Sequence, residues 1–163
     1  LEDGNSHDHP ARGAVIAADI LARLKAPKKL TEETARLVAL HMRDFNLQMK
    51  ENKVRREIVR DYALLEKLFA LRQADFSACK DDLSPAPGVQ KWRTVLEKMR
   101  QEGVPFILKA LAVTGDDLRQ MGFSGERVGA MLHELLDYCT QDGRRNHKDA
   151  LLRHAQNINK ETL

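Results

Sequence analysis

The stretch of sequence that decides the fold is VTGDDLRQMGFSGERVGAMLHELL, residues 113–136. Its apolar residues recur three and four positions apart and continue past its end, at Val128, Met131, Leu132, Leu135, Leu136 and Cys139. This spacing places them on one face of an amphipathic helix. Ahead of that helix, Asp116 and Asp117 put negative charge where a short helix begins, next to the positive end of its dipole. The stretch therefore predicts two helices joined by a tight turn.

Three residues define the details of this predicted pair of helices. Gly122 follows the short helix and can adopt the left-handed conformation of a helix C-cap. Ser124 can accept a hydrogen bond from a free backbone N–H and cap the longer helix. Gly129 lies inside that helix, where glycine costs roughly 1 kcal/mol relative to alanine, so we expect another backbone segment to approach it closely. Packing alone also explains such a hairpin, and the spacing does not decide between packing and binding.

The composition predicts an all-α protein. The chain has 163 residues, with few aromatic residues and many Leu, Ala, Glu, Lys and Arg, which favour helix. No apolar run reaches the roughly 18 residues of a membrane span, and no signal peptide is recognisable, so we expect a cytoplasmic protein without a membrane partner. Cys79 and Cys139 lack metal-ligand spacing and are expected to be free thiols. A net charge of +3 is too small by itself to indicate nucleic-acid binding.

Further helices are expected over residues 10–26, 31–46, 62–79 and 89–101, with a basic segment at 53–60. Ile16, Ile20 and Leu24 share one face of the first of these helices. Thr31 is the predicted N-cap of the second. Residues 83–88 hold two prolines and a glycine, so they are the predicted linker between a helical region at 1–82 and another at 89–163.

Three motifs in a fixed order carry a family resemblance. GDDL at 115–118, GFSGERVGAML at 122–132 and RRNHKDALL at 144–152 resemble the C-terminal region of bacterial tRNA nucleotidyltransferases of the CCA-adding and poly(A) polymerase family. The resemblance extends over nearly the whole chain. It implies a parent enzyme that uses Mg²⁺ with ATP and CTP to add CMP and AMP to a tRNA 3′ end.

The same resemblance implies which part of the parent enzyme this chain represents. The family's catalytic head carries a Gly-Ser motif and a pair of Asp residues that hold two metal ions. Neither motif is present in this chain. We therefore expect a body and tail that position tRNA for an N-terminal catalytic head, with no catalytic residue and no cofactor in this chain.

The first region is similar to the later helices of His-Asp-type (HD) domains in nucleotidyltransferases. The similarity lies in His9 before a Gly-Ala helix, His41 near a helix end, and the LRQAD motif that ends in Asp75. In a complete phosphohydrolase of that class, such residues help to hold a divalent metal. The upstream ligands are absent, so we expect structural roles for these three residues, with Arg72 and Asp75 close enough to pair. A degenerate metal-dependent phosphohydrolase is one alternative function.

The N-terminal lead offers a second possible His-Asp pair, which we reject. Residues 1–6 are polar and expected to fray. His7 and Asp8 follow them, but only six residues precede this pair. A metal-binding dyad needs helical support and further ligands before it, so a histidine-rich surface is the better interpretation.

Basic residues that recur through the last third are the candidate RNA-binding residues: Arg119, Arg127, Arg144, Arg145, Lys148 and Arg153. Asn146 can cap the last helix, and a helix N-terminus beside two arginines suits a phosphate. A solvated charged surface is the alternative, because Asp142 and Asp149 dilute the positive charge. The lack of an aromatic stacking platform favours recognition of a folded RNA by shape and phosphates. A helical protein-interaction module that uses the stripe beginning at Val128 is a further alternative.

Overall fold

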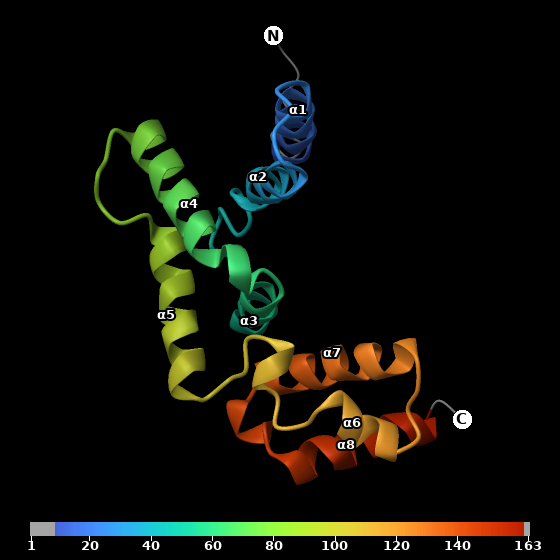
Figure 1. Ribbon diagram of the computed structural model, residues 1–163. Helices are drawn as coiled ribbons and strands as arrows, with labels where there is room; N and C mark the ends of the chain where they lie inside the picture. Colours follow the sequence, from blue (N-terminus) through green and yellow to red (C-terminus); the bar gives the residue numbers. More distant parts are fainter. Residues whose placement is uncertain (1–8, 162–163) are drawn as a thin grey trace. The chain divides into compact units, whose positions relative to one another are not determined.

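The computed structural model describes residues 9–161, and these residues confirm the all-α prediction (Figure 1). The predicted polar lead and the His7–Asp8 pair lie outside the described residues. No strand is present in the described part of the chain. The helices are α1 (His9–Arg23), α2 (Lys28–Leu40), α3 (Glu51–Arg60), α4 (Leu65–Lys80), α5 (Pro87–Gln101), α6 (Gly115–Gln120), α7 (Glu126–Thr140) and α8 (Lys148–Glu161), with short 3₁₀ helices η1 (Tyr62–Leu64), η2 (Leu108–Ala110) and η3 (Gly143–Arg145). None of the described helices combines the length and apolarity that a bilayer crossing needs.

The chain forms two compact units, each made of two segments. The first unit contains Leu1–Met49 and Ala63–Lys91, and the second contains Lys50–Tyr62 and Trp92–Leu163. The predicted linker at 83–88 lies just before the boundary at Lys91. The sequence predicted a single boundary, at 83–88, and so placed α3 in the first region. In the structure α3 belongs to the second unit. The contacts that hold it there come from residues far away in the sequence, which no local pattern indicates.

In the first unit, α1 and α2 pack against each other as a helical hairpin (Figure 1). Gly13 permits a close approach, since a Cβ atom there would lie 3.2 Å from Cγ1 of Val38. The predicted apolar stripe of α1 is present, but no residue of this helix is buried, and Ile16 and Ile20 are 58% and 46% exposed. The described residues therefore leave this face of α1 uncovered.

The predicted N-cap of α2 is wrong. This helix begins at Lys28, and its N-cap is Pro27, whose extended backbone has φ −55° and ψ 138°. Thr31 lies inside the helix, where its hydroxyl donates to the carbonyl of Pro27 over 3.4 Å. The proline turn begins the helix about one turn earlier than the threonine signal indicated.

The core of the second unit is built on α7, as its apolar spacing predicted. Val128, Met131, Leu135, Leu136 and Cys139 are all buried, and Leu132 packs partly buried against the same cluster. Helices α6 and α8 contribute further members of the cluster, namely Leu118, Leu151 and Ala155. Because burying a Leu or Met side chain stabilises a fold by about 1.5–3 kcal/mol, this cluster fixes α6, α7 and α8 as one body.

The ends of α6 and α7 are only partly as predicted. Thr114 and Asp117 form a reciprocal capping box at the start of α6. Gly122 has φ +92°, which agrees with its predicted role after that helix. The predicted Ser124 cap is wrong, because the N-cap of α7 is Gly125, with φ 56° and ψ −136° and no side-chain cap. Glycine reaches this backbone conformation and a serine would not.

The close backbone approach predicted at Gly129 occurs at a different glycine. A Cβ atom on Gly129 would have no atom within 4 Å, so that expectation is wrong. A Cβ atom on Gly143 would instead overlap the carbonyl oxygen of Glu102 and lie 2.6 Å from the backbone nitrogen of Val104. The turn after α7 therefore packs directly on the turn after α5.

Arg55 joins three helices at the centre of the second unit, although it is charged. Its side chain is 4% exposed, and two of its nitrogens donate to the Glu102 carboxylate over 2.7 and 2.8 Å. Its Nε donates to Glu51 over 3.1 Å. Its remaining contacts are to the backbone carbonyls of Thr140 and Gln141, over 3.3 and 3.4 Å. Arg55 therefore ties α3 to the ends of α5 and α7.

Candidate nucleic-acid interface

Two of the predicted RNA-binding residues lie against the first turn of α6. Arg119 Nη1 is 2.5 Å from Asp116 Oδ1, and Lys148 Nζ is 2.5 Å from Asp117 Oδ1. Lys148, followed by the backbone N–H and the hydroxyl of Thr114, lowers the pKa of Asp117 to about 2. Both cations thus have a carboxylate partner. The Arg119 pair is exposed, at 63% and 82%, whereas the Asp117 side chain that binds Lys148 is only 15% exposed.

Arg144 lies in η3, beside Asp142. Its Nε and Nη2 donate to the two oxygens of that carboxylate over 3.0 and 3.1 Å. This paired geometry raises the pKa of Arg144 and lowers that of Asp142. The arginine is nevertheless 87% exposed, and surface pairs of this kind are worth at most about 1 kcal/mol. A phosphate can therefore compete for it at low cost.

Asn146 does not cap the last helix, so that prediction is wrong. Its side-chain oxygen accepts from the backbone N–H of Ala112 over 2.8 Å, and its amide nitrogen donates to the carbonyl of Ala110 over 2.9 Å. Both contacts are to the segment before α6. The asparagine thus holds η2 and η3 together and is not available to shape a phosphate site at α8.

Arg145 packs on Tyr138 near the end of α7. Its guanidinium carbon lies 4.6 Å from the centre of the Tyr138 ring, and its Nη1 donates to the Tyr138 carbonyl over 3.0 Å. The ring of His154 from α8 stacks on the same tyrosine at 3.8 Å. Arg145 therefore supports the α7–α8 packing. No described carboxylate forms an ion pair with it, although its charge contributes, after that of Arg144, to the lowered pKa of Asp142.

The other two predicted residues lie elsewhere on the unit. Arg127, in the first turn of α7, donates to the side-chain oxygen of Asn159 over 2.7 Å. With a rise of 1.5 Å per residue, it is about 20 Å along α7 from Thr140, where the segment with Arg144 and Arg145 begins. Arg153 is exposed on α8 and makes no ion pair with a described residue. The six predicted residues thus do not form one contiguous patch.

A basic face on α3 was missing from the predicted site. Lys53, Arg56 and Arg60 are all exposed, and their spacing of three and four residues places them on one side of the helix. Lys53 makes no ion pair within the described chain. The opposite side of α3 carries the buried residues Val54 and Ile58. The helix therefore buries an apolar side and Arg55 in the unit and presents three cations to solvent. Of these, Arg60 is paired with Glu57 and, over 3.4 Å, with Asp61.

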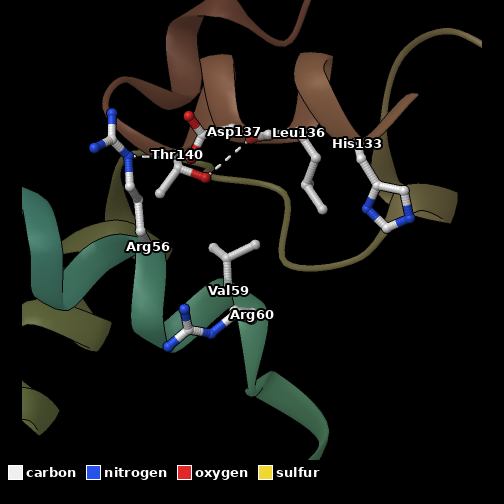
Figure 2. Close-up of a pocket in the computed structure, with 7 residues that line it drawn as sticks. All are labelled: Arg56, Val59, Arg60, His133, Leu136, Asp137 and Thr140. Carbon is white, nitrogen blue, oxygen red and sulfur yellow. Dashed lines mark hydrogen bonds and ion pairs between the residues drawn. The ribbon is translucent and has the colours of Figure 1, made fainter. Parts of the chain in front are cut away.

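A pocket of 240 Å³ opens between this basic face and α7. Figure 2 shows Val59 and Leu136 extending into the space between the two helices, with Arg56 and His133 at its two sides. Arg56 Nε is 3.2 Å from Asp137 Oδ1, and this ion pair is exposed at both ends. Lys53, Arg56 and Arg60 are together called the α3 basic face. Two of them, Arg56 and Arg60, line this depression, whose apolar residues are Val59 and Leu136.

The charge of the chain is divided unequally between the units. The second unit contains 16 Lys and Arg against 13 Asp and Glu, whereas the first contains 11 of each. The whole net charge of +3 therefore belongs to the second unit. This net charge is small, so the placement of the cations on the surface of the second unit has to carry any argument for a polyanionic partner.

The three HD-type residues of the first unit are only partly brought together. His41 and Asp75 line one cavity of 480 Å³, while His9 is exposed at the start of α1 and does not line it. His41 Nδ1 contacts the carbonyl of Val38 at 2.6 Å, which is a structural role. Asp75 makes no hydrogen bond or ion pair with any described residue, so its predicted pairing with Arg72 is wrong.

The described residues contain no group of three or more His, Cys, Asp or Glu side chains arranged to hold a metal ion. The phosphohydrolase alternative therefore has no supporting geometry in this part of the chain. The α3 basic face, Arg144 in η3 and Arg153 in α8 are exposed cationic groups that a negatively charged partner could contact. No protein-family model, no curated protein and no solved structure matches this chain.

Proposed function

We propose that the second unit binds a folded RNA, with tRNA as the expected partner, and that the chain is the body and tail of a CCA-adding or poly(A) polymerase-type tRNA nucleotidyltransferase. The observation that carries the proposal is the basic face of α3 on a unit that holds all of the net positive charge. Contacts from Lys and Arg to phosphates supply most of the affinity in RNA and DNA binding. The resemblance of the GDDL, GFSGERVG and RRNHKDALL motifs supplies the identity of the RNA.

The aromatic residues of the second unit favour a folded RNA over a single strand. Trp92 and Phe123 are buried. Tyr62 stacks on Phe106 with ring centres 4.5 Å apart, and Tyr138 already carries the ring of His154. Single-strand binding depends on exposed rings on which bases stack, so a duplex read through its backbone fits this surface better.

In this proposal the chemistry belongs to another part of the parent enzyme. The N-terminal catalytic head would use Mg²⁺ with ATP and CTP, and this chain would hold the tRNA so that its 3′ end reaches that head. The chain itself then needs no cofactor. The cytoplasm, where tRNA is processed, is the expected location.

The proposal is tested by titrating the purified chain into a fluorescently labelled tRNA transcript and following anisotropy. We expect binding that an unlabelled structured tRNA displaces and that a single-stranded oligonucleotide of equal length does not. Equal displacement by both competitors would refute recognition of a folded RNA. We also expect no incorporation of labelled ATP or CTP into tRNA by this chain, and incorporation would contradict the assignment of catalysis to the head.

Three charge variants separate the two candidate surfaces. One replaces Lys53, Arg56 and Arg60 with Gln, a second replaces Arg144, Arg145 and Lys148 with Gln, and a matched control replaces the exposed first-unit residues Lys25, Lys28 and Lys29 with Gln. We expect the first variant to weaken tRNA binding most and the control to leave it unchanged. Loss of binding in the control that equals the loss in the first variant would show that total charge, and not the α3 basic face, determines affinity.

A further inference from the structure

The first unit contains a cavity that the RNA-binding proposal does not use. Its volume is 480 Å³, within the range of roughly 300–1,000 Å³ that is typical of small-molecule sites. The walls come from the turn after α2, from α4 and from the start of α5. Most of the lining residues are apolar, and they include Met42, Phe45, Leu47, Phe76 and Val89. A cavity with such walls suits a ligand whose body is apolar.

The turn after α2 holds two large apolar side chains at the cavity in a strained conformation. Asp44 and Leu47 both have positive φ, of 60° and 59°, and for a leucine this conformation is uncommon. Three hydrogen bonds from Lys91 Nζ keep the turn in place. They run over 2.8 Å each to the carboxylate of Asp44 and to the carbonyls of Leu47 and Met49. The fold thus fixes Phe45 and Leu47 at this wall while they are 71% and 40% exposed, and strain of this kind is typical of ligand sites.

The charged residues of the lining do not favour an ionic ligand. Arg72 is only 7% exposed, and its Nη2 would lie 2.5 Å from a Cβ atom on Gly88, so it is packed into the wall beside the start of α5. The other two, Asp75 and Lys80, carry opposite charges. An ionic group of either sign would meet one attractive and one repulsive side chain and would lose hydration on entering. The lining therefore favours a neutral molecule.

We propose that this cavity binds a small neutral aromatic molecule. Phe45 and Phe76 line it from two different elements, and aromatic rings in contact gain more than the burial of their apolar area alone. The thioether of Met42 is flexible and polarisable and makes favourable contacts with aromatic rings. This inference concerns the first unit and does not depend on RNA binding by the second.

The dye phenylnaphthylamine tests the proposal, because it is neutral and its fluorescence rises in apolar surroundings. We expect a saturable rise that corresponds to one dye molecule per chain. Three competitors with the same ring system then test the charge, since naphthalenemethanol is neutral, naphthoate is an anion and naphthylmethylamine is a cation. The alcohol should displace the dye at the lowest concentration. Absence of saturable binding, or displacement by either ion at the same or a lower concentration than the alcohol, would overturn the proposal.

The thiol of Cys79 reports whether the dye occupies this cavity. Cys79 lines the cavity and is exposed, whereas the other cysteine, Cys139, is buried. The bound dye should therefore slow the alkylation of Cys79 by the neutral reagent iodoacetamide, and this effect should saturate at the same dye concentration as the fluorescence. Mass spectrometry on the whole chain measures the rate of alkylation. A rate that the bound dye leaves unchanged would contradict binding in this cavity.

Variants at Phe45 test the aromatic wall. Because this residue is 71% exposed, its replacement should leave the fold intact. Phe45→Ala should weaken dye binding about fivefold, and Phe45→Leu, which keeps most of the apolar volume but not the ring, should weaken it about twofold. The matched control is Ile16→Ala, at an α1 residue that is 58% exposed and lies outside the lining. Equal effects of Phe45→Ala and Ile16→Ala, or unchanged binding by Phe45→Leu, would contradict the assignment.

Discussion

Replacement of Arg55 by Met should destabilise the second unit strongly, because this arginine is the charged centre of its packing. Arg55→Met keeps a long apolar stem but removes both hydrogen bonds to the Glu102 carboxylate, which measure 2.7 and 2.8 Å. It also leaves the buried carbonyl of Thr140 without the donor that it has at 3.3 Å. The change therefore creates new desolvated acceptors as well as removing bonds.

The expected loss can be estimated from the contacts that Arg55 makes. Removing one partner of a buried ion pair costs about 3–5 kcal/mol, since the other charge stays behind. The side chains of Glu102 and Glu51 are 31% and 43% exposed, so water can solvate both carboxylates once the arginine is gone. This places the expected loss in the free energy of unfolding near the lower end, at about 3 kcal/mol.

Urea unfolding followed by tryptophan fluorescence measures this loss in the second unit. Trp92 is the only tryptophan of the chain and is buried. The matched control is Arg56→Met at the neighbouring position, where the ion pair with Asp137 is 58% and 49% exposed. That variant should lose at most about 1 kcal/mol. Equal losses for the two variants, or a loss below about 1 kcal/mol for Arg55→Met, would refute the role given to Arg55.

Further predictions concern two glycines, two thiols and one carboxylate. Gly143→Ala should lower the free energy of unfolding by about 1–3 kcal/mol, because the new Cβ atom would overlap backbone atoms. Gly129→Ala should raise it by roughly 0.4–1 kcal/mol. Urea titrations that give the reverse order would contradict both predictions. Burial raises the pKa of the Cys139 thiol to about 11. Iodoacetamide at about pH 8 should therefore modify only Cys79 in the native protein. Alkylation of Cys139 in the native protein, detected by mass spectrometry, would contradict this prediction. The pKa of Asp117 is lowered from 3.8 to about 2, so its contribution to stability is present above pH 3.8 and disappears as the pH falls through 2. The melting temperature of Asp117→Asn should therefore fall less than that of the wild type across this range, and parallel curves would disprove the linkage.

Much of the fold could be predicted from the sequence where the signal is local and periodic. The spacing of Val128, Met131 and Leu135 predicted α7 and its buried side, because a helix of period 3.6 has to place such residues together. Gly122 likewise marked the end of α6. The signals that failed were polar caps, since a Ser or Asn side chain has several possible partners. Asn146 is bound by backbone groups of Ala110 and Ala112, which no local rule could identify.

The candidate site was less predictable, because the availability of each Lys or Arg depends on which carboxylates the fold brings next to it. Arg119 and Lys148 looked like two of six available cations, yet Asp116 and Asp117 pair with them in the structure. The basic face of α3 was visible as a basic segment at 53–60, but only the burial of Arg55 shows which of its cations face solvent. The resemblance to tRNA nucleotidyltransferases remains a prediction that the fold neither requires nor opposes.

The salt dependence of tRNA affinity tests the central claim most directly. Each phosphate contact that is lost should reduce the slope of log Kobs against log[salt] by roughly 0.7–0.9. We predict that the variant with Gln at Lys53, Arg56 and Arg60 has a slope shallower by about two than the wild type, and that the control with Gln at Lys25, Lys28 and Lys29 keeps the wild-type slope. The same slope for all three proteins, or no measurable tRNA binding by the wild type at low salt, would contradict the account.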